Sequence, residues 1–192
     1  MSLRIKKLHG ENLRKFRILL KRPEITLDYL VSGSSYGFFS KGEMIAGFCL
    51  THAPLDEMVS LGWLPSSVRK HFSREDPFKY AEITGYFLNS KKYRLRFKIQ
   101  LLTKILFHKA AYFVYSYPTN NIKIEKQVKL GKPLRIYSGK PENIAGENGI
   151  LLPSSINVEI LSKWGILRIG LIQAARKLKR MVRGICKRTG KT

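Results

Sequence analysis

A cluster of lysine and arginine side chains crowds one short segment of the chain: Lys91, Lys92, Arg94, Arg96 and Lys98. No acidic residue lies between Glu82 and Glu125. The cluster falls just ahead of an expected helix. The first backbone N–H groups of a helix are unpaired and carry partial positive charge, so cations placed there strengthen an attraction for anions. We therefore expect this segment to bind a phosphate group.

The chain as a whole is strongly basic. Its 192 residues carry a formal net charge of +23, and 44% of them are hydrophobic. That hydrophobic share predicts a packed globule. The charge implies an acidic partner: nucleic acid, an anionic membrane face, a nucleotide-like cofactor or an acidic carrier protein.

The cysteine spacing and the N-terminal sequence bear on the location of the protein and on metal binding. Cys49 and Cys186 lie far apart and have no partner spacing, so neither a metal nor a disulfide framework is expected, and a cytoplasmic protein is the default. The N-terminus lacks the apolar core of a signal peptide, and no run approaches the ~20 apolar residues of a spanning helix.

The elements around the basic segment alternate between strand and helix. We expect strands over 80–88, 112–117 and 134–137, and helices over 97–107 and 121–130. Alternation along the first strand puts Glu82, Thr84 and Tyr86 on one face. Ile83 and Phe87 are expected on the opposite face. The strand–helix–strand crossover predicts a parallel pair of strands with a right-handed connection.

The upstream segments predict further strands in the same sheet. Residues 35–39 and 43–51 flank a Gly-bearing turn and indicate an antiparallel hairpin. A strand over 3–8, a helix over 11–21, short helical structure within 54–72 and a last strand near 157–161 complete the pattern. Together they predict one α/β (α+β) domain over residues 1–161, with a mixed sheet and helices.

Residues 162–192 differ in character and predict a basic amphipathic helix with an apolar first half. One alternative is that the helix lies on an anionic membrane, with Trp164 at the interface, which would make the protein peripheral at the membrane. The other is that its apolar part packs on the domain while the last turns form a solvated tail.

The order of elements over 35–139 resembles the GNAT superfamily of N-acyltransferases. The matching segments are Tyr80–Asn89 for the central strand, Lys91–Leu106 for the phosphate loop and helix, Tyr112–Tyr117 for the splayed strand, Asn120 or Asn121 for a loop asparagine, and Lys129-Leu130-Gly131 for a late turn. The resemblance implies a mostly antiparallel sheet with one splayed parallel pair that admits a pantetheine arm.

The same resemblance implies an acyl donor, either acyl-CoA or an acyl carrier protein. Its expected binding residues are Lys92, Arg94, Arg96, Lys98, Asn120 and Asn121. The family's phosphate loop carries glycines, whereas this chain has none between Tyr93 and Lys98. Side chains must then provide more of the phosphate binding, and Arg94 and Arg96 can make charge-assisted hydrogen bonds to phosphate.

The resemblance also suggests catalytic residues. Glu82 on the central strand is the expected general base; a salt bridge to one of the 36 Lys and Arg residues is its alternative role. His52 and His71 are further candidates for the base. A backbone N–H near 85–87 is expected to hold the carbonyl oxygen.

A proton donor is harder to place from the sequence. The family's acidic tyrosine falls near Gln127 or Val128, and neither can donate as an acid. Either Tyr137 or Tyr115 serves from elsewhere, or no protein acid is needed, or catalysis is impaired.

The expected function is therefore transfer of an acyl group from acyl-CoA or an acyl carrier protein to an amine. The alternative is a non-enzymatic basic protein that binds nucleic acid or an anionic membrane surface. Tyr93 and Phe97 interleave with the basic cluster and could stack on bases. No helix-turn-helix, zinc-finger or RNP-type signature accompanies them.

Overall fold

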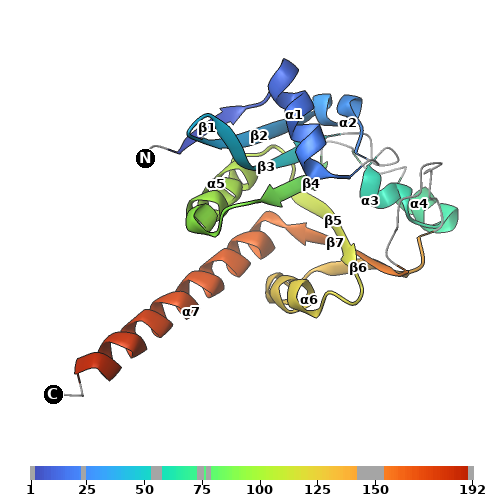
Figure 1. Ribbon diagram of the computed structural model, residues 1–192. Coiled ribbons are helices and arrows are strands. Elements are labelled where there is room, and N and C mark those ends of the chain that lie inside the picture. Colours follow the sequence, from blue (N-terminus) through green and yellow to red (C-terminus); the bar gives the residue numbers. More distant parts are fainter. Residues whose placement is uncertain are drawn as a thin grey trace.

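The computed structural model describes residues 3–22, 25–52, 58–72, 76, 79–141 and 154–189 (Figure 1). One seven-stranded sheet forms the centre, in the order β1-β2-β3-β4-β5-β7-β6. The strands are β1 (Arg4–Lys7), β2 (Gly33–Ser40), β3 (Glu43–Thr51), β4 (Tyr80–Leu88), β5 (Tyr112–Pro118), β6 (Leu134–Gly139) and β7 (Ile156–Ser162). Only β4 and β5 pair in parallel; the other neighbours described are antiparallel. The predicted mixed, mostly antiparallel sheet is confirmed.

Helices cover both faces of this sheet. They are α1 (Gly10–Leu20), α2 (Leu27–Val31), α3 (Val59–Gly62), α4 (Ser66–Phe72), α5 (Arg94–Leu106), α6 (Ile122–Val128) and α7 (Lys163–Thr189), with 3-10 turns η3 (Lys91–Tyr93) and η4 (Lys129–Gly131). Cys49 of β3 packs with the α1 and α2 residues, whereas its neighbours Phe48 and Leu50 pack with those of α5 and α7. Because successive strand residues face opposite sides, α1 and α2 cover one face and α5 and the start of α7 the other.

Aromatic side chains fix both layers against the sheet. Phe97 of α5 is fully buried, and its ring centroid lies 4.7 Å from that of Phe38. On the opposite face, Phe16 of α1 is also fully buried, with its ring 5.8 Å from that of Phe87. Each such buried ring contributes about 1.5–3 kcal/mol relative to exposure. This packing fixes the position of α5 relative to β4.

A β-bulge at Gly85 corrects one prediction about β4. Cys49 pairs with Thr84, whereas Gly47 pairs with Phe87, so the two strands slip by one residue in between. Gly85 has φ +62, and a Cβ there would lie 3.2 Å from side chains of α1. The bulge reverses the alternation beyond it.

The consequence is visible in the aromatic contacts of β4. The ring of Tyr86 packs edge-on against Phe97 of α5, at 5.1 Å. Phe87 instead contacts α1 through Phe16. The predictions that Tyr86 shares a face with Glu82 and that Phe87 shares one with Ile83 are therefore wrong.

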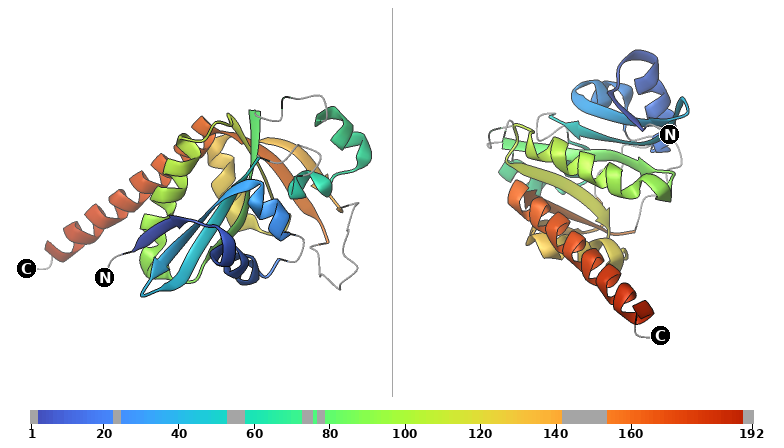
Figure 2. Two further views of the ribbon diagram at one scale, coloured as in Figure 1. Left: turned by 90° about the horizontal axis from the view of Figure 1, so that it is seen from above. Right: turned by 90° about the vertical axis from the view of Figure 1, so that its left-hand side faces the viewer.

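Helix α7 starts in close contact with the sheet and then extends beyond it (Figure 2). A Cβ on Gly165 would lie 2.6 Å from the carbonyl oxygen of Gly131 in η4, so the two backbones touch. Ile166 is buried and Ile169 packs on the same core, as one of the two alternatives for this helix predicts. Within the described residues, no helix is both long and apolar enough to span a bilayer. The division into residues 1–161 and 162–192 remains a prediction.

Candidate functional site

Strands β4 and β5 separate after a short parallel ladder. Their pairing covers only Tyr80 with Tyr112, Ala81 with Phe113 and Glu82 with Val114. Beyond Glu82, β4 stays paired with β3 and β5 stays paired with β7. The two strands therefore part toward their carboxyl ends (Figure 1). The β5-facing edge of β4 is left with backbone groups that can pair with an extended ligand.

The basic N-terminus of α5 lies at the carboxyl end of β4, one short turn away. Its N-cap residue, Tyr93, makes no side-chain capping hydrogen bond, and the first turn of α5 contains no acid. Arg94 and Arg96 are exposed. The Lys92 Nζ lies 5.7 Å from the ring centroid of Tyr93. The Arg94 N–H donates to the Lys91 carbonyl of η3, and exposed cations surround this helix start, which has no side-chain cap. Such an arrangement of positive charge favours an anion.

Lys98 has a different environment from the arginines. It is half-buried on α5 and donates a 2.8 Å hydrogen bond to Oε1 of Gln173 on α7. Burial, and then the charge of Arg94, lower the pKa of Lys98. Lys98, which was predicted to bind the acyl donor, therefore also connects α5 to α7.

The two predicted asparagines lie at the carboxyl end of β5. Asn121 is the N-cap of α6, and its Oδ1 accepts a 3.1 Å hydrogen bond from the Ile124 N–H. The exposed Asn120 uses its carbonyl to accept from the Ile122 N–H, at 3.0 Å. Because β4 and β5 are parallel, these residues and the start of α5 lie at the same end of the opening, where ligands of open α/β sheets commonly bind.

Glu82 lies where the two strands begin to part, and its carboxylate is buried at 2% exposure. Its Oε1 accepts from the Ser60 main-chain N–H at 2.9 Å and from the Ser60 hydroxyl. Its Oε2 accepts from the Tyr29 hydroxyl. Burial raises the pKa of Glu82 above its ordinary value, and the hydrogen bonds from Ser60 and Tyr29 partly oppose that rise; the charge of Arg22 contributes least. Hydroxyls and an N–H, rather than the alternative salt bridge, are the hydrogen-bond partners that the structure describes.

Tyr137 lies apart from this cluster, on the edge strand β6. Strands β5 and β7 stand between β6 and β4 in the sheet order. The Tyr137 hydroxyl donates to the carbonyl of Lys140 at 2.5 Å. The other tyrosine considered, Tyr115, donates to Oε2 of Glu159 at 2.7 Å, and burial and that carboxylate raise the pKa of Tyr115.

Glu159 forms a second buried carboxylate that the sequence analysis did not anticipate. It is 1% exposed on β7. Its Oε1 accepts from the Tyr117 hydroxyl at 3.0 Å and from Arg135 of β6 at 2.8 Å. Arg135 also lies 3.4 Å from Glu125 of α6. This network ties β5, β6 and β7 to the helix that follows the site loop.

The predicted base His52 stacks on another histidine. Its ring centroid is 4.0 Å from that of His108, with the planes 10° apart. Burial lowers the pKa of His52 and brings that of His108 to about 4, so the pair is neutral at physiological pH. The side chain of His71 lies outside the described residues.

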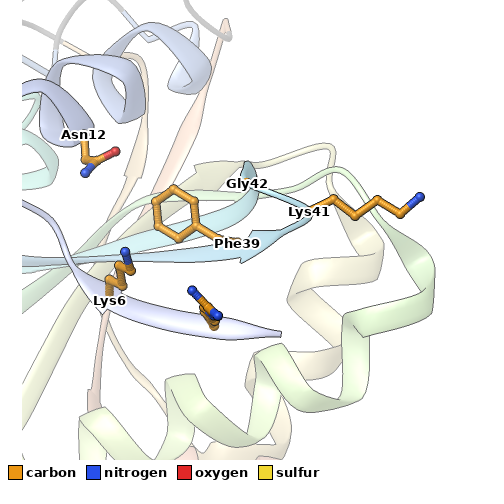
Figure 3. Close-up of a pocket in the computed structure, with 6 residues that line it drawn as sticks. Lys6, Asn12, Phe39, Lys41 and Gly42 are labelled. Carbon is orange, nitrogen blue, oxygen red and sulfur yellow. The ribbon is translucent and has the colours of Figure 1, made fainter. Parts of the chain in front are cut away.

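A basic groove of about 450 Å³ lies at the β1 edge of the sheet, lined by Arg4, Lys6, Asn12, Phe39, Lys41 and Gly42 (Figure 3). In Figure 3 the Lys6 and Phe39 side chains approach each other, whereas Lys41 points away. The hairpin tip that carries Lys41 touches η3, because the Ser40 and Tyr93 hydroxyls are 3.2 Å apart. The groove and the cations of η3 and α5 thus adjoin through the hairpin tip.

Comparisons with known proteins identify the fold. No family model and no curated protein matches the chain. Solved structures do resemble it. FeeM, an N-acyl amino acid synthase from uncultured soil microbes, is 16% identical with a TM-score of 0.56, over 85% of this chain and 93% of FeeM.

Two acetyltransferases show the same likeness. A GNAT family acetyltransferase from Elizabethkingia anophelis with acetyl-CoA bound is 15% identical, with a TM-score of 0.51 over 83% of this chain and 97% of that one. A Bacillus subtilis acetyltransferase in complex with CoA is 17% identical, with a TM-score of 0.52 over 84% and 99%. The predicted GNAT fold is confirmed.

Proposed function

We propose that this GNAT-fold protein transfers an acyl group from a phosphate-bearing thioester to an amine. The observation that carries the proposal is the opening between β4 and β5, which ends beside the cationic N-terminus of α5. Acyl-CoA is the proposed donor. The CoA and acetyl-CoA bound to two structures of the same fold support that choice.

In this proposal the donor lies along the edge of β4. The amide groups of a pantetheine arm form hydrogen bonds with backbone groups of Ile83–Leu88. This part of β4 lies beyond the residues that pair with β5. The pyrophosphate lies at the start of α5, where Arg94 and Arg96 make charge-assisted hydrogen bonds, with support from Lys92, Lys98, Asn120 and Asn121. In this proposal Arg94 and Arg96 bind the pyrophosphate, in place of the backbone N–H groups of a glycine-rich loop.

The reaction then occurs where the strands part. The amine nitrogen attacks the thioester carbonyl carbon, and the carbonyl oxygen becomes an oxyanion. The bulge at Gly85 interrupts the ladder, so a backbone N–H of 85–87 is proposed to donate to that oxyanion. Glu82 is the proposed general base.

Collapse of the intermediate breaks the carbon–sulfur bond and releases a thiolate. Thiols are much more acidic than alcohols, with a pKa of about 8.5 for a cysteine side chain, so a thiolate can leave and take its proton from water. Tyr137 was predicted as the donor of that proton, but β5 and β7 lie between its strand and β4 and its hydroxyl donates to the carbonyl of Lys140, so water is the proposed source.

An acyl carrier protein is the second proposed form of the donor. The specific observation in its favour is the adjoining positive surface, from the groove with Arg4 and Lys6 to the cations of η3 and α5. Carrier proteins are acidic, and complementary charge speeds docking. Faster thiol release from an acyl carrier protein than from the matching acyl-CoA would support this form.

Replacing both Arg94 and Arg96 with alanine is expected to weaken acyl-CoA binding by about 2 kcal/mol or more, about 30-fold in Kd, because charge-assisted hydrogen bonds to phosphate are lost. Titration calorimetry with acetyl-CoA and palmitoyl-CoA measures this. The wild type should also be stabilised by about 2.7 kcal/mol at 100 times Kd.

The matched control is Arg14→Ala/Arg168→Ala, which removes the same charge from exposed positions on α1 and α7. It should bind like the wild type. Stabilisation by DNA or RNA alone, with a steep salt dependence, would instead support the nucleic-acid alternative.

A further inference from the structure

A chain of hydroxyl groups connects the buried Glu82 with strand β5. The Ser60 hydroxyl contacts Oε1 of Glu82, and its oxygen lies 3.0 Å from the Ser116 hydroxyl oxygen. A serine hydroxyl has one proton to donate and can accept at its oxygen. When Ser60 donates to Glu82, the hydrogen bond between the serines must therefore be donated by Ser116. The Ser60 hydroxyl is placed to donate either to Glu82 or to Ser116, and when its one proton goes to Glu82 the chain runs from Ser116 through Ser60 to the carboxylate.

This hydroxyl chain leads from the opening to the buried acid. Ser116 follows Val114 by two residues, and residues two apart share a strand face. Val114 is the last β5 residue that pairs with β4, and its partner is Glu82. Ser116 is half-buried and lies where the strands have parted, while Ser60 and Glu82 are each 2% exposed. A substrate amine can reach Ser116 more easily than Glu82.

We infer that Ser116 and Ser60 relay the proton of the attacking amine to Glu82. The inference rests on the proposed function. As the carbon–nitrogen bond forms, the nitrogen releases a proton to Ser116 Oγ. The Ser116 hydroxyl proton moves to Ser60 Oγ, and the Ser60 hydroxyl proton moves to Glu82 Oε1. The electron pair of the breaking carbon–sulfur bond leaves with the thiolate. Protonated Glu82 is reset by the reverse transfer to solvent.

The other contacts of Glu82 position it for this transfer. Tyr29 holds Oε2 and the Ser60 main-chain N–H holds Oε1, so the carboxylate cannot turn away from the Ser60 hydroxyl. Burial and the nearby Glu82 raise the pKa of Tyr29, so its hydroxyl stays protonated. Tyr29 is therefore a positioning residue, and Oε1 is the acceptor.

The test compares Ser116→Ala and Ser116→Thr in the full chain. Thiol release from acetyl-CoA and palmitoyl-CoA is followed with a panel of amino acids and polyamines, and also with water alone as acceptor, since a water proton would use the same relay. Ser116→Ala should lower the rate about 100-fold with unchanged donor Kd, and Ser116→Thr should restore most of it.

A double mutant separates a relay from a structural role. If both residues act in one relay, Ser116→Ala/Glu82→Gln should be no slower than the slower single variant, because parts of one unit are not additive. Multiplied rate losses, a Ser116→Ala rate equal to wild type, or no rescue by threonine would overturn the relay.

The outcomes for the relay and for the proposed function differ. A wild type that binds neither donor contradicts the proposed function, and with it the relay. Binding without any thiol release overturns the relay and catalysis but leaves the donor site standing.

Discussion

Replacing Glu82 with glutamine is expected to lower turnover of the thioester about 100-fold or more, because general base catalysis typically contributes 10²–10⁴-fold. Glutamine has nearly the same shape, and its amide oxygen can still accept from Ser60 while its NH2 group donates to the Tyr29 oxygen, but it cannot take a proton at pH 7. Acyl-CoA affinity should be unchanged, since the proposed donor contacts are made by α5 and by backbone groups of Ile83–Leu88 and not by the Glu82 side chain. Steady-state kinetics and titration calorimetry on the same samples measure both quantities.

The pH dependence gives this prediction a second readout. Glu82 must be ionised to accept a proton, and burial raises its pKa above the ordinary 4.5. Wild-type turnover should therefore fall as the pH drops through that raised pKa, and the acid limb should be absent from Glu82→Gln. An exposed glutamate of β3 provides the control, because Glu43→Gln should keep wild-type turnover and the acid limb.

The stability of Glu82→Gln separates lost chemistry from lost structure. A raised pKa in the folded state means that folding favours protonated Glu82. The stability this provides is present below about pH 4.5 and is lost as the pH rises through the folded-state pKa. The neutral glutamine should therefore be at least as stable as wild type at pH 7.5. Unchanged turnover would exclude Glu82 as the base.

Replacing Glu159 with glutamine should destabilise the protein by about 1–2 kcal/mol, because hydrogen bonds to a buried carboxylate are lost, while Arg135 is 40% exposed and keeps Glu125 as a partner. The carboxylate is 1% exposed and accepts from Arg135, Tyr115 and Tyr117. Urea unfolding followed by tryptophan fluorescence and circular dichroism measures the change.

Glu125→Gln is the matched control for this network. Glu125 reaches the same Arg135 at 3.4 Å, but its side chain is 23% exposed. Its replacement should destabilise the protein much less, because solvent screens the ion pairs of partly exposed side chains. If the two substitutions lowered the free energy of unfolding equally, burial of Glu159 would not explain its contribution to stability.

Hydrophobic periodicity predicted most of the fold, because strands and helices here bury clear apolar stripes. The strand over 80–88 forms as Tyr80–Leu88, and the expected hairpin forms as β2 and β3. The helix after the basic cluster starts earlier than predicted, at Arg94 rather than at residue 97. The basic residues Arg94 and Arg96 therefore lie within its first turn.

The bulge in β4 was missed because simple alternation assumes an unbroken ladder. An isolated glycine inside a strand is a recognised signal for a bulge, and Gly85 occupies such a position. Its positive φ and the close approach of α1 become visible only once β3 and β4 are paired.

The surroundings of Glu82 could not be predicted from the sequence. Tyr29, Ser60 and Ser116 come from α2, α3 and β5, and no motif links them. Their position depends on the packing of short helices against one face of the sheet. The basic cluster, by contrast, is contiguous in the chain, so its place at a helix start was predictable.

Amide hydrogen exchange with and without saturating palmitoyl-CoA tests the central claim most directly. The donor site is proposed along the free edge of β4 and at the first turn of α5. The account predicts that ligand slows exchange of amides in Ile83–Leu88 and Arg94–Phe97 together, with no change in β1 or β2. Unchanged exchange in both segments, or protection confined to the Arg4–Lys41 groove, would contradict it.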